Sequence, residues 1–163
     1  MFKLKTLIVL VALLVAFCQP CFAADNTKVI GVWRLVAFEI ESQTTGQKEP
    51  VMGENPTGYL SLSAEGRAFV ILTGEGRMAP KSVQDRADLF NSVISYTGKY
   101  RVEGDKWITK VDVASIPDFV GSDQSRFFRV EGNRLYVLTP WGIHPNWPEK
   151  GTTRRVLTFV RDE

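Results

Sequence analysis

The only histidine of the sequence, His144, lies in the segment TPWGIHPNWPEKG, together with two of the four tryptophans and three of the eight prolines. An imidazole titrates near neutral pH and is a common general base in nucleophilic catalysis. A Ser–His–Asp arrangement would have to use His144, but the sequence has no Gly-x-Ser-x-Gly turn to expose a serine. No recognisable catalytic motif is present, and whether the protein is an enzyme stays open at this point.

Metal and phosphate chemistry lack the residues that they need. A zinc site takes several His or Cys ligands, and downstream of residue 23 the chain offers one histidine and no cysteine. Gly74-Glu75-Gly76 is too short for a phosphate-binding loop. Asp112, Asp118 and Asp123 lack the spacing of an EF-hand. We therefore expect no metal and no cofactor, while acid–base catalysis by Tyr, Asp or Glu depends on geometry and remains an alternative.

The stretch DQSRFFRV contains a residue suited to binding an acid. If Arg126 faces inward, its planar fork can hold a ligand carboxylate. The alternation of side chains along this strand does not show which way Arg126 points. It could instead lie on the surface or pair with a buried acid. Aromatic walls with a few polar groups are typical of a small-molecule pocket and also of an ordinary core. The candidate ligand-binding residues are Tyr59, Phe69, Tyr100, Trp107, Arg126, Trp141 and His144.

Eight segments that surround these residues have the composition of β-strands. Three connections, SAEGRA (63–68), RVEGDKW (101–107) and RVEGNRL (129–135), place Glu-Gly between alternating apolar runs, as tight hairpins require. This pattern predicts antiparallel neighbours in sequence order. Each segment is rich in β-branched or aromatic residues and bounded by turn residues; the eight are Trp33–Ile40, Thr57–Ser63, Arg67–Thr73, Ile94–Val102, Lys106–Ala114, Ser125–Val130, Arg134–Thr139 and Thr153–Arg161.

The segment PKSVQDRADLFNSV, residues 80–93, predicts one helix. Val83, Ala87, Phe90 and Ile94 follow helical spacing and share one face, which we expect to cover an end or a side of the sheet. Eight antiparallel strands with one short α-helix are most economically arranged as an all-β, up-and-down barrel, because closure removes exposed strand edges. The interior of such a barrel is filled by side chains or holds one small ligand.

The segment Thr139–Thr152 is too proline-rich to pair and is expected to form a long, stiff hairpin loop at one barrel end. Trp141, Ile143 and Trp147 are costly to expose. We therefore expect them to fold over the barrel mouth as a lid or to contact a protein partner, with plain packing and a catalytic His144 as alternatives.

Gly31-Val32-Trp33 resembles the lipocalin signature, in which a tryptophan plugs the closed barrel end and an arginine of the last strand lies over its ring. The arginine candidates are Arg154, Arg155 and Arg161. The blocks GVWRLVAFE, NPTGYLSLSAEGRAFV, YTGKYRVEGD and IPDFVGSDQSRFFRVEGNRLYVLTP resemble, in order, the small lipocalin-like domain family of bacteria and fungi. The resemblance implies a barrel of the lipocalin or fatty-acid-binding kind and little about activity.

The first 23 residues have the pattern of a signal peptide that is removed on export. Lys3 and Lys5 precede the apolar run Thr6–Phe17, and Cys21 and Ala23 occupy the small positions of a cleavage site. The run is too short to span a membrane. Phe17 and Pro20 precede the two cysteines, which excludes a lipoprotein signal. We expect a barrel domain over residues 24–163, in the periplasm or secreted.

Removal of this segment balances the charge, because it takes two of the 20 basic residues and leaves 18 basic against 18 acidic ones. A neutral chain without a basic cluster is poorly suited to nucleic acids. It also loses both cysteines, so its core alone must hold it together. We expect a binding barrel for a small hydrophobic or amphipathic, partly apolar and acidic molecule. The alternatives are an isomerase- or cyclase-type enzyme and a filled-core interaction domain with a protein partner at Trp141–Trp147.

Overall fold

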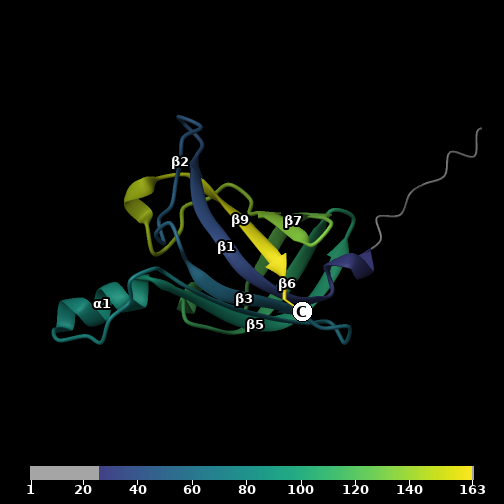
Figure 1. Cartoon of the computed structure of the whole chain (residues 1–163), viewed down its shortest axis with the longest axis horizontal. Helices are drawn as coiled ribbons and strands as arrows, with labels where there is room; N and C mark the ends of the chain where they lie inside the picture. The colour runs from purple at the N-terminus through teal and green to yellow at the C-terminus, as the bar shows by residue number, and fades with distance from the viewer. Residues whose placement is uncertain (1–25, 163) are drawn as a thin grey trace, which may run out of the picture.

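The computed structural model describes residues 26–162, and the expected signal peptide, residues 1–23, lies outside the described residues. Eight long strands pair antiparallel in sequence order, and the last pairs with the first to close a barrel (Figure 1). A ninth, two-residue strand, β2 (Lys48–Glu49), pairs with the end of the first. The barrel strands are β1 (Gly31–Ser42), β3 (Thr57–Leu62), β4 (Arg67–Thr73), β5 (Val93–Glu103), β6 (Lys106–Ala114), β7 (Asp123–Glu131), β8 (Arg134–Leu138) and β9 (Thr153–Arg161).

The predicted eight-stranded up-and-down barrel with one short α-helix is therefore confirmed. Its two ends differ in the length of their connections. At one end, called the closed end, the three Glu-Gly hairpins place Gly66, Gly104 and Gly132 at φ of 82°, 62° and 58°. Only glycine takes this conformation without strain, which is why such short turns form there. The other, open end carries all the long connections, residues 43–56, 74–92, 115–122 and 139–152.

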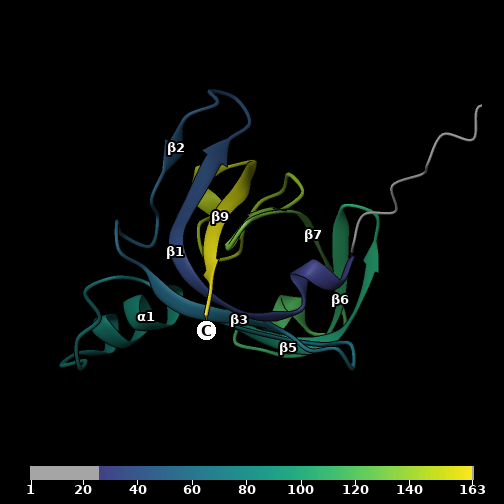
Figure 2. The same ribbon diagram turned by 45° about the vertical axis from the view of Figure 1, so that its right-hand side comes forward.

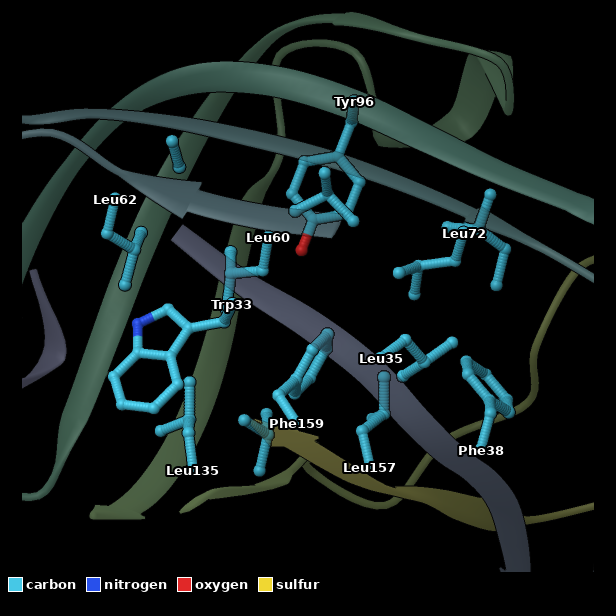
Figure 3. Close-up of a cluster of buried hydrophobic side chains, with 14 of the residues drawn as sticks. Trp33, Leu35, Phe38, Leu60, Leu62, Leu72, Tyr96, Leu135, Leu157 and Phe159 are labelled. Carbon is cyan, nitrogen blue, oxygen red and sulfur yellow. The ribbon is translucent and has the colours of Figure 1, made fainter. Parts of the chain in front are cut away.

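The closed end is plugged by Trp33, which is fully buried. Its indole N–H donates to the Val29 carbonyl at 2.8 Å, which ties β1 to the preceding 3-10 helix η1 (Asn26–Val29). Leu35, Leu60, Leu62 and Leu135 are each at most 2% exposed. Figure 3 shows Leu60 and Leu62 of β3 and Leu135 of β8 gathered around Trp33, with Leu35 farther along β1 toward Phe38. The half of the barrel next to the closed end is thus filled by side chains.

The helix α1 (Val83–Asn91) begins with a capping box, in which the Ser82 hydroxyl accepts from the Asp85 N–H. It lies in an arm that projects from the open end, between β4 and β5 (Figures 1 and 2). None of its residues is buried, and Val83 and Phe90 are 79% and 50% exposed. The expectation that this helix covers the barrel is therefore wrong. Ile94, the last residue of the expected face, belongs to β5 and points into the barrel instead.

Two further 3-10 helices, η2 (Pro117–Phe119) and η3 (Pro148–Lys150), lie in the long connections of the open end. Among residues 26–162, no helix combines the length and the apolar composition needed to cross a membrane.

Candidate ligand-binding site

A cavity opens in the half of the barrel next to the open end. Nine apolar side chains line it: Phe38, Leu60, Val70, Leu72, Ile94, Phe119, Val137, Leu157 and Phe159. Six polar or amphipathic side chains complete the lining: Tyr96, Trp107, Arg126, Thr139, His144 and Arg155. It is a small cavity, in which the centre of a water-sized sphere can move through about 40 Å³. None of the lining residues is a carboxylate.

Four of the polar residues form one row across adjacent strands. Trp107 of β6 pairs directly with Arg126 of β7. The β7–β8 register, continued by one pair beyond Phe127 and Leu138, brings Thr139 next to Arg126. Thr139 is in turn tied to β9, because its N–H donates to the Arg155 carbonyl at 3.1 Å. The barrel wall therefore holds two arginines at one level, with one strand between them.

Arg126 faces the interior and is 8% exposed. One Nη donates to the Ser125 carbonyl at 2.7 Å and the other to the Gln124 Oε1 at 3.2 Å. Its Cζ lies 5.7 Å from the centroid of the Tyr96 ring, within the range of a cation–π contact. These partners fix the guanidinium but are neutral, and no carboxylate of residues 26–162 pairs with it.

Arg155 is half-buried on the inner face of β9. Within the described part of the chain its guanidinium has neither a hydrogen bond nor an ion pair. Burial, and secondarily the charge of Arg126, lower the pKa of Arg155 from its ordinary value to about 10. The side chain remains charged at neutral pH, so the cavity holds two cations that no carboxylate of residues 26–162 offsets.

His144 enters the cavity from the loop that follows β8 and is 3% exposed. Burial, followed by the charges of Arg155 and Arg126, lowers its pKa to about 3. The imidazole is therefore neutral over the physiological range. Its Nδ1 accepts from the Asn146 N–H at 3.1 Å, which assigns the remaining proton to Nε2. His144 thus supplies a neutral N–H donor rather than a third charge.

The loop of residues 139–152, called the mouth loop, folds over the open end mainly through one of its tryptophans. Trp147 stacks on His144 with ring centroids 4.6 Å apart and meets the edge of Phe38 at 5.9 Å. Trp141 instead lies outside, beneath the guanidinium of Arg154 at 4.7 Å, and is 39% exposed. Of the two tryptophans expected at the barrel mouth, Trp147 packs there together with His144, and Trp141 does not.

Two buried polar atoms of β6 find no partner in the described residues, the Nε1 of Trp107 and the Oγ1 of Thr109. Trp107 lines the cavity and Thr109 follows two positions later on the same inner face. The hydroxyl of Tyr96 also makes no hydrogen bond to residues 26–162, and Figure 3 shows it directed into the barrel. A buried polar group without a partner costs free energy, so Trp107 and Tyr96, which line the cavity, favour an occupant that can accept hydrogen bonds.

Three of the seven residues expected to bind a ligand line the cavity: Trp107, Arg126 and His144. The other four do not. Tyr59 and Phe69 point outward from β3 and β4 and are 43% and 53% exposed. Both strands bury the alternate residues, and the face that carries Tyr59 and Phe69 is exposed. Tyr100 is directed to the closed end, where its hydroxyl donates to the Ser63 carbonyl, and Trp141 stays outside.

Sequence reasoning missed Tyr96, Phe119, Thr139 and Arg155 as lining residues. Arg155 was considered only as a partner of Trp33, a role that belongs to Arg161. In the pair Arg154-Arg155, alternation requires that one side chain face inward, and this was the available signal. Within residues 26–162, no group of three or more His, Cys, Asp or Glu side chains comes together as a metal site.

Comparison with protein families supports this architecture. A family model described as a lipocalin-like domain matches residues 30–162. No functionally curated protein matches the sequence.

Proposed function

Because the chain belongs to the lipocalin-like domain family, whose barrels suit the binding of small molecules, we propose that it is an exported protein that holds a small, partly apolar acid. The acid lies beneath the mouth loop, with its anionic group at Arg126 and its apolar part against the nine apolar lining residues. The observation that carries this proposal is the inward, 8% exposed guanidinium of Arg126 without a carboxylate partner among the described residues.

The energetics favour a charged occupant. A buried cation is tolerated when it is paired, and an uncompensated one costs several kcal/mol. A ligand carboxylate offsets this cost through short, charge-assisted hydrogen bonds. Arg126 is held in place by Ser125 and Gln124 before any ligand arrives, so little conformational entropy is lost on binding.

The packing limits the size of the ligand. The closed half of the barrel is filled around Trp33, and the open space in the other half is small. A compact ring or a short branched chain is therefore favoured over a long acyl chain, which would have to displace the core.

The proposal can be tested with a small acid and its neutral counterpart. Tryptophan fluorescence, to which Trp107 in the cavity wall and Trp147 beside His144 contribute, is followed during titration with cyclohexanecarboxylate and with cyclohexanecarboxamide. We expect the acid to bind at least about tenfold more tightly than the amide, because only the acid forms a charge-assisted pair. Arg126→Gln should abolish this difference. Arg129→Gln removes the same charge from the outer face of β7 and should leave the difference intact. Equal binding of acid and amide to the wild type would contradict the proposal.

Export is tested separately. The amino terminus of the protein purified from its source should begin after Ala23 or Ala24. A mature chain that retains Met1 through Phe17 would argue against a periplasmic or secreted location.

A further inference from the structure

The cavity contains more positive charge than one carboxylate can offset. Arg126 and Arg155 both line it, and within residues 26–162 neither pairs with a carboxylate. His144 is neutral and adds a donor but no charge. A singly charged acid at Arg126 therefore leaves the guanidinium of Arg155 uncompensated in the same low-dielectric space.

The two arginines are also arranged as two separate anchors. They start from β7 and β9, and Thr139, directly after β8, lies between them. Two strand spacings, about 10 Å, therefore separate their backbones. Arg126 is restrained by Gln124, Ser125 and the Tyr96 ring. The backbone N–H of Arg155 donates to the Thr139 hydroxyl, but its guanidinium N–H groups have no partner among the described residues. A second acceptor group can meet Arg155 without displacing anything.

Unpartnered donors lie beside this pair. The indole N–H of Trp107, next to Arg126 across the β6–β7 ladder, has no acceptor among the described residues although Trp107 is only 2% exposed. The Tyr96 hydroxyl also lines the cavity without a partner there. One carboxylate has about four lone-pair positions, fewer than two guanidinium forks, an indole, a phenol and an imidazole offer together.

From these observations we propose that the ligand carries two negative charges, one at Arg126 and one at Arg155, on a compact apolar body. This inference rests on the proposed function and specifies its ligand class. Two chemistries meet the requirement, a dicarboxylic acid and a phosphate monoester, and both present several acceptor oxygens to the donors of the row.

Isothermal titration calorimetry near pH 7.5 in a low-chloride buffer tests this inference. The three probes share one ring and differ in charge: cyclohexanecarboxylate, cis-cyclohexane-1,3-dicarboxylate and cyclohexyl phosphate. We expect at least one of the two dianions to bind at least about tenfold more tightly than the monoanion. Preference for the dicarboxylate or for the phosphate then identifies the source of the second charge.

Variants assign the preference to its residue. Arg155→Gln should bring the dianions to within about twofold of the monoanion while monoanion binding persists, because Arg126 is intact. Arg155→Lys keeps the charge without the fork and should retain part of the preference. Arg129→Gln, on the outer face, should behave as the wild type. Thermal unfolding of each variant shows whether it is folded before titration.

The outcomes separate this inference from the proposed function. If the monoanion binds the wild type as tightly as both dianions, or if Arg155→Gln weakens all three probes equally, the doubly charged ligand is excluded while acid binding stands. If none of the three probes binds the wild type, both proposals fail.

Discussion

The guanidinium of Arg161 lies over the indole of Trp33, with its Cζ 4.1 Å from the ring centroid. From this position it also donates to the carbonyls of Ile30 and Lys28, at 3.0 and 2.6 Å. One side chain thus joins the last strand, the first strand and the preceding 3-10 helix η1. The contact seals the end of the barrel opposite the cavity, so it stabilises the fold without taking part in the site.

Arg161→Ala should therefore destabilise the protein without changing its ligand affinity. We expect a loss of about 2 kcal/mol in the free energy of unfolding, from one cation–π contact and two charged hydrogen bonds at a partly exposed site. Urea denaturation measures it, and the exposed Arg134→Ala serves as the control. A loss no greater than that of the control would contradict the role assigned to Arg161.

Arg155→Met should stabilise the unliganded protein. The fold lowers the pKa of Arg155 from its ordinary value to about 10, so the charged form is disfavoured there. The full cost applies at neutral pH, which lies below both the folded and the unfolded pKa. Removal of the charge should raise the free energy of unfolding by about 1–3 kcal/mol. Thermal unfolding without ligand checks this expectation, and a lower melting temperature than that of the wild type would contradict it.

Because of His144, the free energy of unfolding should decrease as the pH falls below 6.5. Its pKa is 6.5 in an unfolded chain and about 3 in the fold, so between these values the unfolded state binds the proton preferentially. The contribution of neutral His144 to the free energy of unfolding is complete above pH 6.5. It falls by up to about 1.4 kcal/mol per pH unit as the pH drops toward 3. His144→Gln removes this term. Urea denaturation at several pH values should show a shallower acid decline in the variant; parallel curves would count against a buried neutral imidazole.

Asn146 should control how readily the mouth loop opens. Its side-chain amide donates to the Asn91 carbonyl at the end of α1 at 2.9 Å, while its N–H holds His144. Asn146→Ala loses the first bond and keeps the second, so we expect ligand dissociation to become about fivefold faster, the effect of one hydrogen bond. Asn91→Ala is the matched control, because it retains the backbone carbonyl. Stopped-flow measurement gives the ligand dissociation rate of each variant. Equal rates in the two variants would show that the Asn146 side chain does not hold the mouth loop closed.

Local signals in the sequence were sufficient for the strands, the Glu-Gly hairpins and the tryptophan plug, because each depends on residues close in the chain or on a short motif. The direction of a side chain was harder to predict. Phe69 and Val70 are equally apolar, and only the closed register shows that Val70 faces inward. Likewise, the spacing of Val83, Ala87 and Phe90 predicts a helix correctly. It does not predict that this helix lies in an arm projecting from the barrel, where its apolar face does not contact the sheet.

The pairing of the two arginines had no local signal. Arg126 and Arg155 are 29 positions apart, and they line the same cavity because only β8 separates their strands in the closed sheet. His144 joins them only because the mouth loop folds back over the opening, held by contacts of Trp147 and Asn146.

Native mass spectrometry of the protein purified from its source shows whether the barrel holds an acid. We expect the wild type to carry a small bound molecule that ionises as an anion after denaturation and that excess cyclohexanecarboxylate displaces. Arg126→Gln prepared in the same way should carry none. If wild type and Arg126→Gln both show the bare polypeptide mass, or both retain the same uncharged molecule, the barrel does not hold an acid at Arg126.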